Sequence, residues 1–170
     1  GGVGRVLDVG SSESVDALVD AVAKEFGAIT ILVNNAGITR DNLLMRMKDE
    51  DWDSIMSTNL KSVYRLSKAV IRGMMKARAG RIINITSTSG PVQAFVGDAA
   101  YHAAKAGMWG FTRACALETA ADGITVNAIC PGYIETEMTG AMKPEVLESI
   151  IRQIPMARMV FYNSLADPFS

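Results

Sequence analysis

The stretch ITILVNNAG, residues 29–37, indicates the fold class of this sequence. It is a short apolar run rich in β-branched residues that ends in Asn, Ala and Gly, the pattern of a buried parallel strand leading into a loop. Three other stretches share this pattern, namely RVLDV (5–9), RIINITS (81–87) and ITVNAICPG (124–132). The sequence therefore predicts four parallel strands.

Helical segments alternate with these runs. Residues 11–27 begin with serine caps, carry an apolar stripe and end at a glycine. Residues 48–80 read as a longer helix, acidic at its start and basic at its end, as the helix dipole favours. Two further helices are expected over 99–121 and 143–154, the last with Pro144 in its first turn.

Strand–helix alternation predicts an α/β fold, in which right-handed crossovers build a parallel sheet covered by helices on both faces. The sequence shows no repeat and no linker, so we expect one domain. Functional loops of such sheets leave the carboxyl ends of the strands. The unusual residues of this chain gather at those ends: Asp8, Asn34, Asn35, Ala36, Gly37, Ser87, Pro131 and Gly132.

Composition excludes several classes of function. The chain has 170 residues, 49% of them hydrophobic, with 17 basic and 18 acidic side chains and a net charge of -1. This balance argues against a nucleic-acid partner. Apolar runs fall short of the roughly 18 residues of a membrane span. Cys115 and Cys130 are interpreted as reduced thiols of a cytoplasmic protein, and a single His excludes a multi-His metal site.

The motif YHAAK (101–105) places a Tyr and a Lys one helical turn apart. Alone, this spacing also fits an ordinary surface helix. In their order along the chain, however, NNAG (34–37), Asn59, INITS (83–87), YHAAK and NAICPGYIETEM (127–138) resemble the short-chain dehydrogenase/reductase family. The stretch from NNAG to Asn59 is similar to the 3-oxoacyl-[acyl-carrier-protein] reductases within it. The resemblance covers roughly residues 4–158.

The resemblance implies a set of catalytic roles. Hydride transfer between a nicotinamide and a carbonyl needs a proton for the forming alkoxide, and a phenol suits this if its pKa of about 10 is lowered. Tyr101 would be the general acid, and the Lys105 ammonium would lower its pKa and hold the nicotinamide ribose. Ser87 would bind the substrate oxygen. Asn59 would hold a water that links Lys105 to solvent; a local backbone bond or an exposed position is its alternative.

Ser87 has competitors for its role. Family members usually carry this Ser thirteen residues before the Tyr, which is position 88 here. The strand-end pattern favours Ser87, with one residue inserted in the loop 91–98. The neighbouring hydroxyl residues that remain alternatives are Thr86, Thr88 and Ser89.

The resemblance also implies the cofactor contacts. The cofactor would be NADP, with NAD as the alternative, because the segment that discriminates them is absent. If NNAG and PG do not contact a cofactor, they are a plain turn and a strand terminator. Residues 133–154 are either a mobile substrate lid or a surface helix. The implied contact residues are Asp8, Val9, Asn34, Asn35, Ala36, Gly37, Tyr101, Lys105, Pro131, Gly132, Ile134 and Thr136.

Both ends of the chain depart from the family pattern. GGVG (1–4) has no strand before it, so it is not a glycine-rich dinucleotide loop in its required context. We therefore expect a partial Rossmann-like, doubly wound domain over residues 1–158 that lacks the first two strands and the last strand. Residues 159–170 would be a non-matching tail.

Three functions follow as hypotheses. The first is NADPH-dependent reduction of a 3-oxoacyl thioester in fatty acid biosynthesis. The others are a short-chain dehydrogenase for a sugar, polyol or small alcohol, and a non-catalytic fragment. For an acidic acyl carrier protein we expect a basic rim of Lys76, Arg78 and Arg81, opposed by Asp122. The family resemblance implies a tetramer through residues 48–78 and 99–121.

Overall fold

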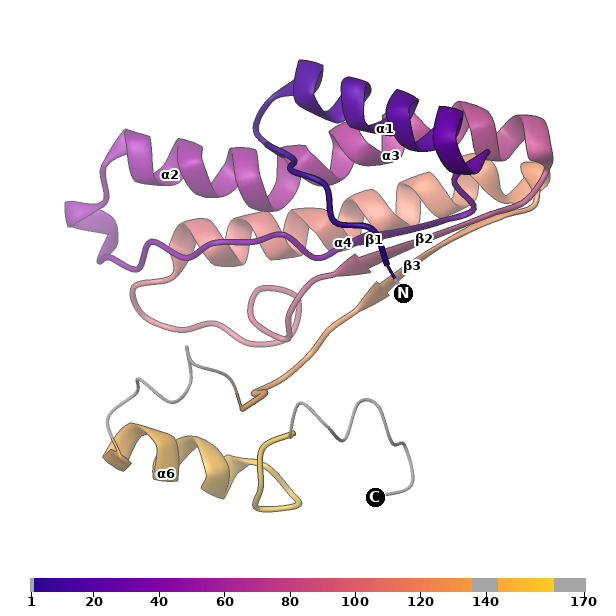
Figure 1. The fold of residues 1–170 in the computed structure, drawn as a ribbon. Helices are drawn as coiled ribbons and strands as arrows, with labels where there is room; N and C mark the ends of the chain where they lie inside the picture. The colour runs from indigo at the N-terminus through magenta and orange to yellow at the C-terminus, as the bar shows by residue number, and fades with distance from the viewer. Residues whose placement is uncertain (1, 136–143, 161–170) are drawn as a thin grey trace. The chain divides into compact units, whose positions relative to one another are not determined.

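A computed structural model describes residues 2–135 and 144–160 (Figure 1). The chain divides into two compact units, Gly1–Cys130 and Pro131–Ser170, and each is described by itself. Short helical turns are labelled η, and η2 is π-helical. The elements of the first unit are α1 (Ser12–Phe26), β1 (Ile31–Asn34), η1 (Leu44–Arg46), α2 (Asp49–Ile55), η2 (Met56–Lys61), α3 (Ser62–Ala77), β2 (Gly80–Ile85), α4 (Ala99–Thr119), η3 (Ala120–Asp122) and β3 (Ile124–Ile129).

The three strands form one parallel sheet in the order β1-β2-β3. Val33 is level with Ile83, and Ile83 is level with Asn127. Parallel pairing brings the three carboxyl ends to one edge of the sheet, where the polar loops begin. The predicted parallel α/β sheet is confirmed in its partial form.

The predicted strand at residues 5–9 is wrong. This segment is an extended loop, and the Val6 side chain is 100% exposed. Arg5 ties the segment to α1 through an ion pair with Glu25. In the strand order 3-2-1-4 that is usual for dinucleotide-binding sheets, two further strands would lie between residues 5–9 and β1. Among the described residues no strand lies between them to supply the ladder hydrogen bonds, so the segment pairs with nothing.

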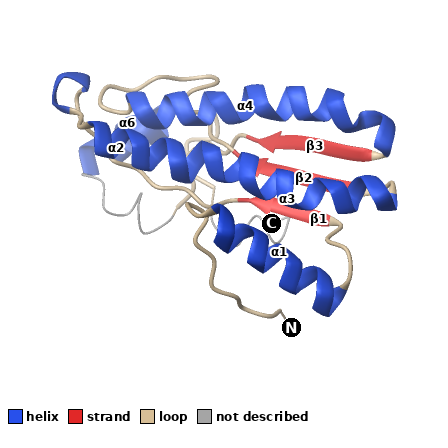
Figure 2. Ribbon diagram, turned by 90° about the horizontal axis from the view of Figure 1, so that it is seen from above, coloured by secondary structure: helices blue, strands red, loops and turns tan. Residues whose placement is uncertain are grey.

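Helices of the first unit lie on one face of the sheet, not on both (Figure 1). Figure 2, viewed from above, shows α1, α3 and α4 in front of the strands. The reason is directional: successive right-handed crossovers that step the same way along a sheet place their helices on the same side. Within residues 2–130 no crossover steps the other way, so the opposite face stays open. Ile31, Val33 and Ile129 are exposed there.

The hydrophobic core lies between the covered face and α3 and α4. Alternate strand residues point into it, which is the two-residue period of a pleated strand. Residues of α3, β2, α4 and β3 form the buried cluster, which consists of Val70, Met74, Ile82, Cys115, Ile124 and Val126. A second cluster of Ile55, Ala100 and Ala104 joins α2 to the first turns of α4.

The helix boundaries follow the sequence signals closely. The N–H of Ser14 donates to Ser11 Oγ at 3.2 Å, which caps α1, and Gly27 ends the helix at φ 88°. The predicted helix at 48–80 is continuous from 49 to 77, with the π-helical turn η2 in its middle. No helix in the described parts of the chain is long and apolar enough to cross a membrane.

The second unit contains α6 (Pro144–Gln153), which begins at the predicted proline. A short parallel bridge pairs Ile134 with Val160. The N–H of Glu135 donates to the carbonyl of Val160 at 2.9 Å. The division into domain and tail at residue 158 remains a prediction.

A substitution at Gly123 tests the packing between the loop before β3 and the end of α3. Its φ is +76°, and an added Cβ would lie 2.5 Å from the carbonyl oxygen of Arg78. We expect Gly123→Ala to lower the free energy of unfolding by about 1–3 kcal/mol, because both the backbone conformation and the contact are strained. Urea unfolding measures the change.

Gly73→Ala is the matched control. This glycine lies in α3, and nothing is within 4 Å of its added Cβ. Alanine should stabilise the helix there by about 0.5–1 kcal/mol. Equal effects of the two substitutions would contradict the packing described for Gly123.

Candidate active site

Tyr101 and Lys105 occupy successive turns at the start of α4. Lys105 Nζ lies 5.6 Å from the centroid of the Tyr101 ring. The Lys105 side chain is buried, and its ammonium donates a 2.8 Å hydrogen bond to the carbonyl of Ile85 at the end of β2. This bond joins α4 to the carboxyl edge of the sheet, where a site is expected.

Ser87 lies two residues beyond that carbonyl, and hydrogen bonding by its side chain lowers the pKa of Tyr101. Its Oγ also accepts from the N–H of Ser89 at 3.0 Å. Thr86 points the other way: its hydroxyl is buried and donates to the carbonyl of Lys105 at 3.0 Å. The geometry therefore favours Ser87 over Thr86 as the hydroxyl beside Tyr101.

Asn59 lies in η2 and is fully buried. Its Oδ1 accepts from the N–H of Ile38, and its Nδ2 donates to the carbonyl of the same residue, both at 2.8 Å. A Cβ added to Gly37 would lie 3.5 Å from Asn59 Oδ1 and 3.8 Å from Lys105 Nζ. Asn59 thus fixes the loop after NNAG against Lys105, and π-helical turns are frequent at functional sites.

A ladder of buried polar side chains lies beneath this cluster. Asn34 Nδ2 donates to Asn84 Oδ1 at 2.8 Å, and Asn84 Nδ2 donates to Thr112 Oγ1 at 2.9 Å. Sequence reasoning missed Asn84 and Thr112. The signal was an asparagine at the same place in two adjacent strands, level with each other in the sheet. The Asn34 side chain is buried, with Nδ2 bonded in this ladder and Oδ1 without a partner among the described residues, so a cofactor role there would use its backbone.

The pKa of Tyr101 differs from the expectation. Burial raises it, the hydrogen bond with Ser87 lowers it, and the charges of Asp98 and Asp41 raise it further, so that the pKa stays above its ordinary value. The Lys105 ammonium is directed at the Ile85 carbonyl and lies over the ring instead of at the phenol oxygen. Burial lowers the pKa of Lys105 itself to about 8.

The residues assigned to the adenine end lie in the loop before α1. The N–H of Gly10 donates to Asp8 Oδ1 at 2.8 Å, so the carboxylate closes a local turn. Arg65 of α3 donates to the carbonyl of Val9 at 3.2 Å. The loop is thereby fixed to α3.

The remaining cofactor residues divide between the two units. Asn35, Ala36 and Gly37 form an exposed loop at the carboxyl end of β1. Pro131, Gly132 and Ile134 belong to the second unit, and Thr136 lies outside the described residues.

The residues of the first unit fit a nicotinamide cofactor. The ammonium of Lys105 has three N–H groups, of which one donates to Ile85, so two can serve ribose hydroxyls. The Gly37 backbone approaches the same ammonium without an intervening Cβ. Both features suit a sugar edge lying between the loop and α4.

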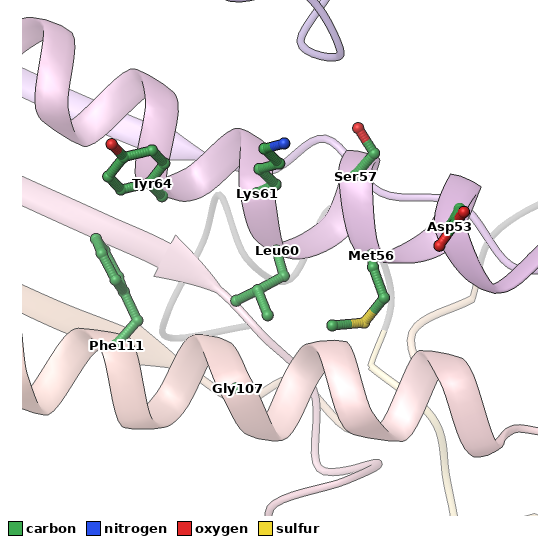
Figure 3. Close-up of a pocket in the computed structure, with 8 residues that line it drawn as sticks. All are labelled: Asp53, Met56, Ser57, Leu60, Lys61, Tyr64, Gly107 and Phe111. Atoms are coloured by element: carbon green, nitrogen blue, oxygen red, sulfur yellow. The ribbon is translucent and has the colours of Figure 1, made fainter.

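A groove of about 710 Å³ lies elsewhere, between the continuous segment α2–η2–α3 and α4 (Figure 3). An added Cβ at Gly107 would lie 2.9 Å from Leu60 Cδ2, so the helices approach closely at its floor. Ser87, Tyr101 and Lys105 do not line it. The groove residues are Asp53, Met56, Ser57, Leu60, Lys61, Tyr64, Gly107 and Phe111.

The expected basic rim lies at the opposite edge of the sheet from Tyr101. Arg81 is the second residue of β2, whereas Ser87 lies two residues beyond its end. The six residues of the strand span about 20 Å, which separates the two side chains. Arg78 forms an ion pair with Asp122 at 3.6 Å. Within this chain, Lys76, Arg78 and Arg81 therefore form no rim around Tyr101 and Ser87.

Fold and site together define a dehydrogenase-type domain, and residues 3–146 match the short chain dehydrogenase family. The chain belongs to that family. It is 54% identical over 158 residues to the 3-oxoacyl-[acyl-carrier-protein] reductase of Vibrio cholerae, covering 93% of this chain and 64% of that protein.

Two other relatives carry the same description. The Pseudomonas aeruginosa protein is 54% identical, over 93% of this chain and 64% of its own length. The Escherichia coli protein is 52% identical over 166 residues, which are 98% of this chain and 68% of that protein. This chain thus spans about two thirds of the length of these relatives.

Asn59→Leu tests the anchoring of the loop after NNAG. It leaves the N–H and carbonyl of Ile38 without their partner, and we expect a loss of about 1–3 kcal/mol for each unpaired group. Asn127→Leu, on the exposed face of β3, should change the free energy of unfolding by no more than about 0.5 kcal/mol. Similar losses in both variants would argue against the anchor.

Asp98 tests the pH dependence of stability. Burial first, then the hydrogen bond and charge of Asp41, raise the pKa of Asp98 from 3.8 to about 6. Between those values the folded chain binds this proton more tightly than the unfolded chain, so the contribution of Asp98 to stability falls as pH rises. Asp98→Asn should remove this fall, as urea unfolding across the interval would measure. An unchanged slope would contradict the assigned environment.

Proposed function

We propose that this chain carries the catalytic part of an NADPH-dependent 3-oxoacyl-[acyl-carrier-protein] reductase. It would reduce the 3-oxo group of an acyl thioester to a 3-hydroxyl group. The observation that carries the proposal is the convergence of Asn59, Ser87, Tyr101 and Lys105 at one edge of the sheet. The named relatives, at 52–54% identity over almost the whole chain, support the substrate class.

Each residue has a chemical task in this reaction. Bound NADPH would supply the hydride, with its two electrons, to the 3-oxo carbon. Ser87 would hold the substrate oxygen, and Tyr101 would donate its phenolic proton to that oxygen. Lys105 would hold the ribose and compensate the charge of the phenolate that remains. Asn59, through Ile38, would keep the loop at the site in place.

The partners are part of the same proposal. The acyl group would be carried as a thioester on an acidic carrier protein, in the cytoplasm, as a step of fatty acid biosynthesis. A homotetramer would use the groove between η2–α3 and α4, whose apolar members include Met56, Leu60 and Phe111. Trp109 and Leu117 add exposed apolar surface on α4, which is typical of an interaction face.

Tyr101→Phe tests the proton donor. The variant should lose turnover by about 10²–10⁴-fold, the usual contribution of a general acid, and retain NADPH binding. Tyr64→Phe is the matched control: Tyr64 is exposed on α3, so removal of its hydroxyl should leave turnover unchanged. The assay follows oxidation of NADPH with a 3-oxoacyl thioester.

Several outcomes would separate the three hypotheses. Turnover of sugars or polyols in place of the thioester would favour the general short-chain dehydrogenase. Failure of the chain to bind NADPH would favour the non-catalytic fragment. Full turnover by Tyr101→Phe would exclude Tyr101 as the acid.

A further inference from the structure

The imidazole of His102 joins two segments next to Tyr101. The N–H of Phe95, in the loop between Ser87 and α4, donates to His102 Nε2 at 3.1 Å. His102 Nδ1 lies 2.7 Å from the carbonyl oxygen of Asp98, the residue that precedes α4. The Phe95 ring also meets the imidazole edge-on, with 5.8 Å between the ring centroids. One side chain therefore connects the loop to the start of the helix that carries Tyr101.

These two hydrogen bonds define the protonation state of the His102 ring. A backbone N–H can only donate, so Nε2 accepts and carries no proton. A carbonyl oxygen can only accept, so the proton of the neutral ring is on Nδ1. We call the bonds from Phe95 to His102 and from His102 to Asp98 the histidine clamp. The clamp requires a neutral imidazole with its proton on Nδ1.

The loop meets fixed parts of the unit on either side of Phe95. Near its start, Gly90 has a φ of +105°, and an added Cβ would lie 2.6 Å from the carbonyl oxygen of His102. Near its end, the carbonyl of Gly97 accepts from the N–H of Asn42 at 2.8 Å, which joins it to the loop after β1. The clamp bond at Phe95 anchors the part of the loop between these two points.

We propose that His102 is a positioning residue: in its neutral form it holds the loop around Phe95 against the start of α4, and in its protonated form it releases that loop. A proton taken up at Nε2 occupies the lone pair that accepts from Phe95, so two N–H donors face each other and the bond is lost. The bond from Nδ1 to the Asp98 carbonyl remains. Histidine is the side chain that ordinarily changes charge between about pH 5 and 8, which suits it to this role.

The effect on turnover rests on the proposed function. Along the chain, the loop connects Ser87 to the helix of Tyr101, and Phe95 and Val96 expose apolar side chains on it that could contact an acyl group. Ser87 keeps its own hydrogen bond from a backbone N–H at 3.0 Å, which the clamp does not involve. Release of the loop should therefore raise KM for a 3-oxoacyl thioester more than it lowers kcat.

Other titratable groups near the imidazole have to be separated from it. Tyr101 is its neighbour on α4, with 6.5 Å between the ring centroids. Asp98 carries a carboxyl whose pKa the charge of His102 lowers, and Asp41, from the loop after β1, raises the pKa of that same carboxyl. Asp98→Asn removes the carboxyl and keeps the backbone carbonyl to which His102 is bonded, so it is the matched control.

The experiment uses the fact that the chain contains a single histidine. Nitrogen-15 NMR of the labelled full chain reports the tautomer and charge of His102 directly, and Phe95→Leu identifies the amide signal of Phe95 among the five phenylalanines. We expect the proton on Nδ1 at about pH 8, and a Phe95 amide signal that moves with the imidazole midpoint as the pH falls. His102→Gln does not titrate and should abolish this movement, whereas Asp98→Asn should retain it.

A neutral ring with its proton on Nε2, or a Phe95 amide signal that does not follow the imidazole, would overturn the proposal. Movement that survives in His102→Gln and disappears in Asp98→Asn would overturn it too, because the carboxyl would then be its cause.

Turnover tests the positioning role separately. Below the imidazole midpoint, KM for the thioester should rise several-fold in the wild-type chain and stay level in His102→Gln, and an equal rise in both would refute the role. The NMR titration needs neither cofactor nor turnover. An intact clamp in a chain that never reduces a 3-oxoacyl thioester would therefore refute the proposed function and leave the clamp standing.

Discussion

The hydrogen bond from the buried Lys105 ammonium to the carbonyl of Ile85 is the interaction on which the site depends. A charge removed from water needs a partner, and here the partner is the last residue of β2. The bond fixes the start of α4 against the carboxyl edge of the sheet. Ser87, two residues further, is thereby placed beside Tyr101, and the loop at Gly37 lies against the same ammonium.

The direction of winding explains the rest of the architecture. Three strands in sequential order, joined by right-handed crossovers, put their helices on one face and their loops at one edge. The covered face therefore holds the core and the polar ladder that begins at Asn34, whereas Ile31 and Val33 on the opposite face stay exposed. One constraint thus places the candidate site at one edge of the sheet and leaves apolar side chains exposed on the opposite face.

Prediction from sequence succeeded where the signal is local. The helix limits at Ser11 and Gly27 follow from capping chemistry, and the parallel strands follow from apolar runs that end in polar turns. Prediction failed where pairing between distant segments decides. Residues 5–9 have the composition of a strand, but strand structure needs a neighbour. The pKa of Tyr101 is likewise raised by burial, which no local pattern reveals, and the lysine one turn along is directed at the Ile85 carbonyl.

By itself, the sequence determined the fold class, the order of the elements and the identity of Asn59, Ser87, Tyr101 and Lys105 as site candidates, because residue type and spacing are local properties. Only the tertiary structure decided that the Thr86 hydroxyl points to the Lys105 carbonyl, how Asn59 holds the carbonyl and N–H of Ile38, and that burial raises the pKa of Tyr101. Those facts depend on burial and on contacts between loops that are far apart in the chain, and no local pattern encodes them.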